Sequence, residues 1–300
     1  MNFKHFTKQI ADKNLDVRAL MIKIDDETLQ YGEINELYDI RSISKTVITM
    51  AAGILNKLLP NEFNENTNVY PIIKDVVNLT NKTNLEYLKM IKVKHLLTHT
   101  IGYEEVLLMR NDIIEHNPFD LVNFVINYPI SQKPGTYYLY SNAGFYLLSV
   151  VMQELIGKDL IHFIDEYLFK PLNIKDYKWE KYGNYLAGAT RLWLKPKDLL
   201  KIGQLMLEND DTIVPANWIN YMKVKSIHTP NVDTPDRTFR RYAYGHGLWL
   251  SKEDELFFAH GTDGQILLIV PNKNAIILTL STESNMDEIE NIVESILNGL

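Results

Sequence analysis

A hydroxyl and an amine stand three residues apart in the tetrapeptide Ser42-Ile43-Ser44-Lys45. Apolar residues then recur at helical spacing over residues 44–58, which predicts a buried helix with Ser42 on its first turn. Side chains three apart share a helix face, so the Lys45 amine can reach the Ser42 hydroxyl. A helix start favours negative charge on the nucleophile, and burial can lower the pKa of a lysine until it acts as a base. By itself, however, this spacing is more typical of a helix cap beside a solvated lysine.

A second polar segment, Tyr140-Ser141-Asn142, follows a turn and precedes a predicted helix. Its polar groups are therefore expected on the lip of a loop, from which Tyr140 could approach Ser42. A phenol near a lysine loses its proton more easily, which makes Tyr140 a candidate general base or proton shuttle.

A third segment, His260-Gly261-Thr262, lies at the end of a predicted strand. Glycine at this point would let the backbone lie against a substrate without a side chain in the way. The amide of Asp263, just beyond, could complete an oxyanion hole with the amide of Ser42.

The elements that must bring these segments together lie at both ends of the chain. Alternating apolar residues predict a hairpin at 17–24 and 27–32, and further strands at 244–250, 255–261, 265–271 and 275–282. The sequence between is mostly helix and loop, and a charged amphipathic helix closes the chain. We therefore predict an α/β (α+β) fold, an antiparallel sheet flanked by helices with a mostly helical inserted subdomain.

The expected division is one structural unit with two parts. Residues 1–59 and 185–300 would form the α/β sheet subdomain, and residues 60–184 the mostly helical one. No stretch rich in Gly, Ser or Pro separates independent domains.

Composition excludes several classes of function. The net charge of −7 provides no positive field for a nucleic acid. Cysteine is absent, which excludes disulfides, a thiolate nucleophile and Cys-rich zinc sites. No apolar run is long enough for a membrane span or a signal peptide, so we expect a cytoplasmic protein.

Metal and cofactor motifs are also missing. His95 and His99 stand four apart, but no glutamate completes an H-E-x-x-H pattern, and we interpret both as structural residues. Neither a phosphate-binding glycine loop nor a G-x-S-x-G nucleophile elbow is present. We expect no cofactor and no bound metal.

Taken in order, S-x-x-K, Y-S-N and H-G-T resemble the three motifs of serine β-lactamases and penicillin-binding proteins, closest to the class C β-lactamase-like group. Further stretches look like that family, including HLLTHTIGY at 95–103 and PGTYYLYSNAGFYLLSVVMQELIGK at 134–158. The resemblance implies a β-lactamase/transpeptidase-like fold. It also implies that Ser42 is an acyl-accepting nucleophile activated by Lys45.

The resemblance extends to the remaining residues. It implies that Tyr140 is the base for attack and the acid for the leaving group, while Asn142 holds Lys45 and meets the substrate amide. His260 stands where β-lactamases usually keep a lysine that pairs with the β-lactam carboxylate, which puts efficient penicillin hydrolysis in doubt. The sequence looks most like the branch of esterases and nylon-oligomer hydrolases. Tyr103 follows a segment that forms a pocket wall in the family, so it lines the pocket or is a plain surface tyrosine.

Two functions remain open at this point. The first is a serine hydrolase that forms an acyl-enzyme with a small ester, amide or peptide. The second is a catalytically quiet relative that binds a ligand or serves as a scaffold. The sequence does not indicate an oligomeric state.

Overall fold

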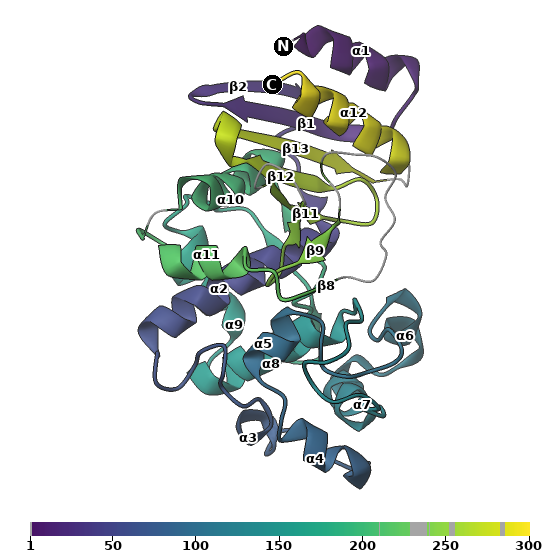
Figure 1. The fold of residues 1–300 in the computed structure, drawn as a ribbon, viewed down its shortest axis with the longest axis vertical. Helices are drawn as coiled ribbons and strands as arrows, with labels where there is room; N and C mark the ends of the chain where they lie inside the picture. Colours follow the sequence, from purple (N-terminus) through teal and green to yellow (C-terminus); the bar gives the residue numbers. More distant parts are fainter. Residues whose placement is uncertain (1, 210, 229–238, 240, 252–255, 283–285) are drawn as a thin grey trace.

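An antiparallel sheet brings the two ends of the chain together (Figure 1). The computed structural model describes residues 2–209, 211–228, 239, 241–251, 256–282 and 286–300. Eight strands pair within this part of the chain, in the order β2 (Glu27–Gly32), β1 (Val17–Ile24), β13 (Ala275–Ser281), β12 (Ile266–Val270), β11 (Phe257–His260), β10 (Trp249–Leu250), β9 (Ala243–Tyr244) and β8 (Ile227–His228). The pairing of β1 with β13 therefore joins the first strand to the last.

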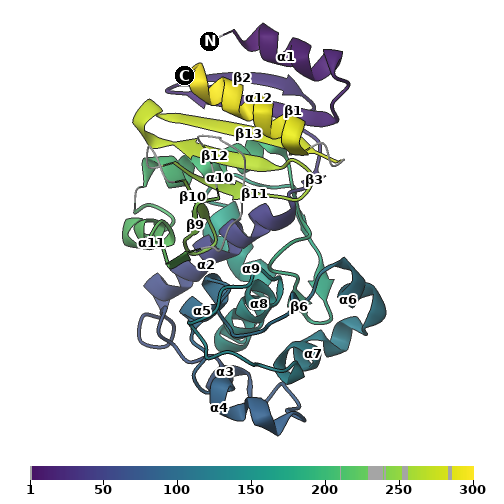
Figure 2. The ribbon, with the colours of Figure 1, turned by 45° about the vertical axis from the view of Figure 1, so that its right-hand side comes forward.

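Helices cover both faces of this sheet (Figures 1 and 2). Along β12, Ile266 and Leu268 belong to the core that includes residues of α1 (Phe3–Asp12) and α12 (Met286–Asn298). The alternate residues Leu267 and Ile269 belong to the core beneath α10 (Pro196–Glu208). Successive side chains of a strand point to opposite faces, so a strand covered on both sides is apolar throughout.

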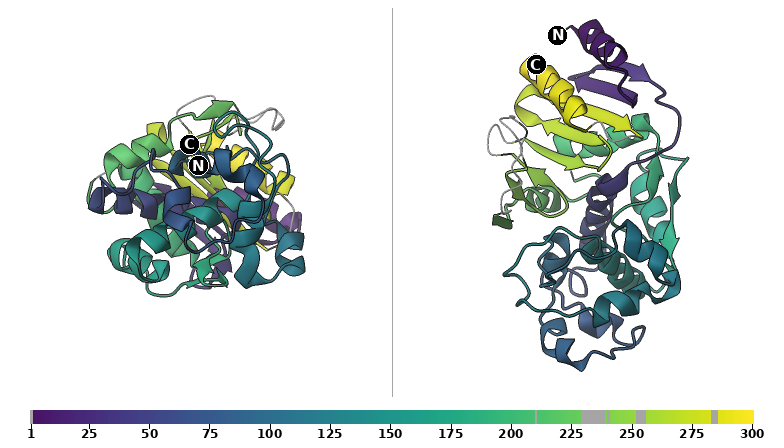
Figure 3. Two further views of the ribbon diagram at one scale, coloured as in Figure 1. Left: turned by 90° about the horizontal axis from the view of Figure 1, so that it is seen from below. Right: turned by 90° about the vertical axis from the view of Figure 1, so that its right-hand side faces the viewer.

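The other half of the molecule is mostly helical, with α2 running between it and the sheet (Figure 3). The remaining helices are α2 (Ser44–Leu58), α3 (Tyr70–Ile73), α4 (Leu85–Leu88), α5 (Val93–Leu97), α6 (Arg110–Glu115), α7 (Leu121–Asn127), α8 (Ala143–Ile156), α9 (Leu160–Ile164) and α11 (Ala216–Met222). None of the helices within the described ranges is long and apolar enough to span a bilayer. The predicted fold class is confirmed, whereas the subdomain boundaries remain a prediction.

Two small sheets lie outside the main one. The first has the order β3 (Tyr38–Asp39), β7 (Leu192–Leu194), β4 (Lys178–Trp179), and the second pairs β5 (Lys181–Tyr182) with β6 (Tyr185–Leu186). The pairing of β3 with β7 brings the residues just before Ser42 next to a segment about 150 residues further along the chain.

The strand predicted over residues 244–250 is wrong. The chain turns there, and the Gly245 amide donates to the Leu248 carbonyl at 2.9 Å, so two short strands form instead of one. Gly247 has a φ of +78°, and a Cβ at this position would lie 2.3 Å from Thr49 Oγ1. Only glycine suits both the backbone conformation and the close packing against α2.

The packing of α2 against α11 gives a stability prediction. We expect Gly53→Ala to lower the free energy of unfolding by about 1–3 kcal/mol, because overpacking outweighs the helix propensity that alanine gains. A Cβ on Gly53 would lie 2.3 Å from Cδ1 of Trp218, whose indole is held by a 2.9 Å hydrogen bond to the Thr49 carbonyl. Urea unfolding measures the change, with Gly299→Ala near the C-terminus as control. Equal stability of Gly53→Ala and the wild type would contradict this packing.

Candidate active site

Ser42 lies on a tight turn that leads into α2. Residues Arg41–Ile43 form a single 3₁₀ turn, and α2 begins at Ser44, so Ser42 precedes the helix rather than standing on its first turn. The Asp39 carboxylate accepts the Arg41 amide at 2.9 Å, at the first residue of this turn. Ser42 thereby lines a pocket of about 300 Å³.

Lys45 points from the first turn of α2 toward Ser42. Its Nζ lies 3.0 Å from Ser42 Oγ, 2.8 Å from Asn142 Oδ1 and 3.2 Å from the carbonyl oxygen of Ala189. The side chain is 1% exposed, and this burial lowers the pKa of Lys45 to about 7. A large fraction of the amine is therefore neutral at neutral pH and able to accept a proton from Ser42.

Tyr140 also reaches the pocket, and its phenol lies close enough to the Ser42 hydroxyl for the two groups to interact. Lys45 Nζ lies 4.8 Å from the centroid of the Tyr140 ring. Burial raises the pKa of Tyr140 to about 12, and the opposing effects of the neighbouring Ser42 hydroxyl and of the Arg241 charge are smaller. The expectation that this phenol loses its proton easily is thus wrong, because desolvation outweighs its favourable neighbours. Near neutral pH Tyr140 therefore keeps its proton, whereas a large fraction of the Lys45 amine is neutral.

Asn142 connects Lys45 to a pocket wall. Its Oδ1 accepts from Lys45, and its Nδ2 donates to the Leu108 carbonyl at 2.9 Å. The neighbouring Ser141 hydroxyl holds the same loop through both the amide and the carbonyl of Leu107, each at 3.0 Å. The Y-S-N segment therefore positions the Lys45 amine and the loop of Leu107 and Leu108 together.

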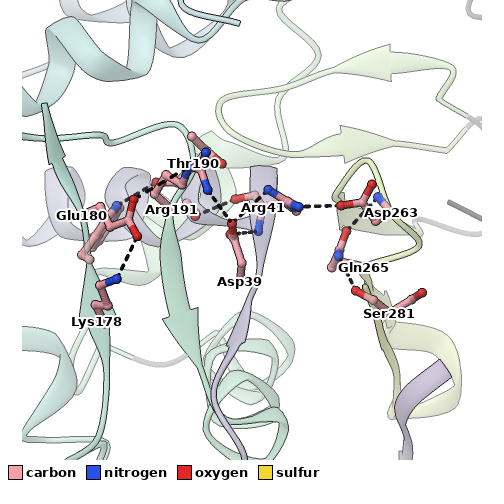
Figure 4. Close-up of polar contacts among 11 residues, drawn as sticks. Asp39, Arg41, Lys178, Glu180, Thr190, Arg191, Asp263, Gln265 and Ser281 are labelled. Carbon is pink, nitrogen blue, oxygen red and sulfur yellow. Dashed lines mark hydrogen bonds and ion pairs between the residues drawn. The ribbon is translucent and has the colours of Figure 1, made fainter. Parts of the chain in front are cut away.

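The third segment differs from its expected arrangement. Thr262 and Asp263 line the pocket, but the Asp263 amide donates to Gln265 Oε1 at 3.0 Å. Gln265 is buried, and its Nε2 donates to the Ser281 carbonyl at 2.7 Å. The expected oxyanion donor is therefore already engaged by a side chain that the sequence did not indicate (Figure 4).

Gly261 and His260 serve the packing of this segment. A Cβ at Gly261 would lie 2.9 Å from Arg41 Cβ, so glycine lets the strand end pack beside the Ser42 turn. His260 Nε2 lies 2.9 Å from Glu290 Oε1 on α12 and 3.3 Å from Arg241 Nη2. His260 is 8% exposed and is not part of the pocket wall. It was expected to bind substrate, but it belongs instead to a buried polar cluster with Glu290 and Arg241.

Tyr103 lies outside the pocket. Its ring is 3% exposed, and its hydroxyl donates to the Val125 carbonyl at 2.7 Å. Both expectations for it, a pocket wall and a surface tyrosine, are wrong, because α7 covers the residue. Leu108, Met109 and Ile113, a few residues further along, form the apolar wall.

Comparison with known proteins agrees with this geometry. A family model described as Beta-lactamase matches residues 24–294. The chain belongs to the beta-lactamase family. Members of this family are generally serine hydrolases.

Individual relatives of this beta-lactamase family member are distant. Protein flp from Staphylococcus aureus (strain MW2) is 24% identical over 229 residues, which cover 68% of this chain and 45% of that protein. The chain thus spans less than half the length of this curated relative.

Solved structures share the fold over nearly the whole chain. The octameric penicillin-binding protein homologue from Pyrococcus abyssi has a TM-score of 0.79 at 19% identity. The match covers 100% of this chain and 78% of the homologue. A putative 6-aminohexanoate-dimer hydrolase from Bacillus anthracis has a TM-score of 0.73 at 18% identity, with coverage of 97% and 80%. EstCE1, a hydrolase with promiscuous acyltransferase activity, has a TM-score of 0.76 at 12% identity, with coverage of 97% for both chains.

Backbone strain in this beta-lactamase family member gathers around the pocket. Among the described non-glycine residues with positive φ, all but four are Asn or Asp, which tolerate this conformation. Of the four others, Arg41, Leu108 and Arg191 line the pocket, and His99 packs behind Tyr140 at a centroid distance of 4.3 Å. Strained residues of this kind cluster at functional sites. The sequence did not indicate the two arginines as pocket residues: Arg191 reaches the pocket through the pairing of β7 with β3, and Arg41, although it precedes Ser42, belongs to none of the three motifs.

His99 supports the second segment from behind. Its Nδ1 accepts the Ser141 amide at 3.3 Å, and burial keeps the pKa of His99 well below its ordinary value. The ring is therefore neutral and acts as an aromatic wall for Tyr140. No group of three or more His, Cys, Asp or Glu side chains suited to a metal ion occurs in the part of the chain that the structure describes.

Proposed function

We propose that this protein hydrolyses small esters or amides through an acyl-enzyme on Ser42. The observation that carries the proposal is the buried amine of Lys45, 3.0 Å from Ser42 Oγ and with a pKa of about 7. In the first step Lys45 takes the hydroxyl proton while Ser42 Oγ bonds to the substrate carbonyl carbon. Tyr140 then gives its proton to the leaving group and recovers one from Lys45, and water releases the acid in a second attack.

The lining of the pocket supports a small, partly apolar substrate. Leu108, Met109 and Ile113 offer an apolar wall opposite the polar groups, and about 300 Å³ accommodates a small molecule. His260 stands where β-lactamases usually keep the lysine that pairs with the β-lactam carboxylate, but it faces Glu290 and is not part of the pocket wall. No cation therefore meets the carboxylate from this side of the pocket, and we expect weak or no turnover of β-lactams. The structural likeness to EstCE1 and to the 6-aminohexanoate-dimer hydrolase supports ester or amide substrates.

The alternative of a quiet binding or scaffold protein is less well supported. Burying the Lys45 amine costs folding free energy at neutral pH, because the folded state disfavours its charged form. A protein that only binds a ligand has no need for this arrangement. No contact in the described residues specifically favours the alternative.

Turnover of a substrate panel tests the proposal. We expect hydrolysis of 4-nitrophenyl butyrate and of short amides, and a mass increase of one acyl group on the intact protein after a rapid acid quench. Nitrocefin, a chromogenic β-lactam, is expected to react slowly or not at all. Absence of both turnover and acylation across esters, D-amino-acid peptides and amides would favour the binding protein.

The role of Tyr140 gives a prediction that depends on the leaving group. We expect Tyr140→Phe to lower kcat/KM by about 100-fold or more for an alkyl amide, which needs a proton on departure. For a 4-nitrophenyl ester, whose leaving group is stable as an anion, the expected loss is smaller. Steady-state kinetics with both substrates provides the measurement. An equal loss for the two would contradict the acid role and indicate a positioning role.

A further inference from the structure

Two arginine side chains line the pocket beside Ser42 (Figure 4). Arg41 directly precedes Ser42, and Arg191 lies at the start of β7. Both side chains are 34% exposed, and both backbones have positive φ. The buried carboxylate of Asp39 stands between them, with its Oδ2 at 3.1 Å from Arg41 Nη1 and 3.9 Å from Arg191 Nη1.

The two arginines differ in how fully they are paired. Arg41 makes hydrogen bonds to Asp39 and, through its Nε at 2.8 Å, to Asp263. Arg191 makes loose ion pairs within the described residues, at 3.9 Å to Asp39 and 3.9 Å to Glu180, and its guanidinium also interacts with the Tyr182 hydroxyl. These distances exceed the range of 2.7–3.2 Å typical of an N–H···O hydrogen bond. Glu180 in addition accepts from Lys178 at 2.8 Å. Arg191 therefore keeps donors to offer to a ligand.

The charges that face the pocket do not cancel. Its charged lining residues, within the described ranges, are Arg41, Arg191 and Asp263. Because Asp263 is engaged by Arg41, the charge of Arg191 has no carboxylate of its own in the pocket wall. A planar guanidinium in this position suits a carboxylate, which it can bind through two parallel hydrogen bonds.

Arg191 is also close to the reacting groups along the chain. Two residues before it, the Ala189 carbonyl accepts from Lys45 Nζ at 3.2 Å. Two residues of extended chain span at most about 7 Å, so the backbone of Arg191 is anchored close to the catalytic amine. A carboxylate bound here would lie within a small molecule's length of Ser42.

We propose that Arg191, supported by Arg41 and Asp39, binds a carboxylate on the substrate, so that the preferred substrates are esters or amides that also carry an acidic group. The inference rests on the proposed hydrolase function and names its substrate class. The apolar wall of Leu108, Met109 and Ile113 receives the carbon chain, and Arg191 the acidic end.

Matched pairs of substrates test this proposal. One pair carries the charge in the acyl group, 4-nitrophenyl hydrogen adipate against its methyl ester, and the other in the leaving group, 3-carboxyphenyl butyrate against 3-carbamoylphenyl butyrate. For at least one pair we expect the wild-type kcat/KM to be about 10-fold or more higher for the anionic member, as for a charge-assisted hydrogen-bonded pair. The pair that shows the preference identifies which side of the scissile bond faces Arg191.

Variants assign the preference to one side chain. Arg191→Gln is expected to bring the ratio of kcat/KM for the anionic and neutral substrates close to one. Arg191→Lys is expected to keep an intermediate ratio, because lysine retains the charge but lacks the planar guanidinium that binds a carboxylate through two hydrogen bonds. A general loss of folded protein or of catalytic rate lowers kcat/KM for both members of a pair. The ratio therefore isolates the effect of the substrate's carboxylate. Arg18→Gln changes an arginine that pairs with Asp16 at 2.7 Å outside the pocket, and should leave both the rate and the ratio unchanged.

Binding without turnover separates this inference from the proposed function. Calorimetry with monomethyl adipate uses proteins that carry Ser42→Ala, so that the ester is not hydrolysed. It is expected to show about 10-fold weaker affinity for the protein that also carries Arg191→Gln than for the one that keeps Arg191. A wild-type ratio near one in both pairs, or an unchanged ratio in Arg191→Gln, would overturn the carboxylate site while leaving the hydrolase intact. If no substrate turns over, the hydrolase proposal fails, and equal affinity of the two proteins for monomethyl adipate would overturn the carboxylate site as well.

Discussion

Ser42→Ala is expected to lower kcat/KM for every ester substrate by at least about 1,000-fold. The hydroxyl is positioned to form the acyl bond, since Lys45 Nζ contacts it at 3.0 Å and Ser42 and Tyr140 both line the pocket. Loss of the oxygen leaves Lys45 with its contacts to Asn142 and Ala189, so the fold should be unaffected.

The measurement combines steady-state kinetics with intact-protein mass spectrometry after reaction with a fluorophosphonate. We expect the wild type to gain one adduct and Ser42→Ala none. Ser295→Ala, which removes an exposed hydroxyl on α12, serves as the matched control and should behave as the wild type. Labelling or turnover by Ser42→Ala at the wild-type rate would rule out the acyl-enzyme assigned to this residue.

Lys45→Met is expected to lower kcat/KM by about 1,000-fold or more and to change its dependence on pH. The pKa of Lys45 is about 7, so the amine is protonated below this pH and cannot take the Ser42 proton. Wild-type kcat/KM should therefore rise with pH and level off above about pH 7. The residual activity of Lys45→Met should lack this rise, because the group that titrates has been removed.

Two control variants test whether the loss of activity comes from the missing proton acceptor. The alternatives are the loss of a positive charge and a change in α2. Lys45→Arg keeps a cation that does not lose its proton, and is expected to be as inactive as Lys45→Met at all pH values. Lys57→Met changes an exposed lysine at the other end of α2 and should retain the wild-type profile. If the rise near pH 7 persisted in Lys45→Met, another group would be the base. Tyr140 would then be an unsuitable alternative, since its pKa is raised to about 12.

Local relationships were predictable from the sequence because backbone geometry alone sets them. Ser42 and Lys45 meet because they are three residues apart at a helix start, and the spacing of apolar residues predicts α2 over its observed range. The strands of the antiparallel sheet were indicated in the same way by runs of apolar residues between turns. The order of the three polar segments additionally indicated the family, and with it the fold that brings Asn142 to Lys45.

The side chains that shape the pocket were decided only by the tertiary structure. Arg191 reaches the Ser42 turn because β7 pairs with β3, and Asp263 meets Arg41 across a separation of 222 residues. His260 turns to Glu290 because α12 covers that face of the sheet, and Tyr103 is buried because α7 packs over it. Such contacts depend on strand register, on the packing of helices far apart in the chain and on which partner best satisfies a buried polar group. None of these is determined by the residues near the one concerned. The contact between Ser42 and Lys45 could therefore be predicted from local spacing, while the selectivity of their pocket could not.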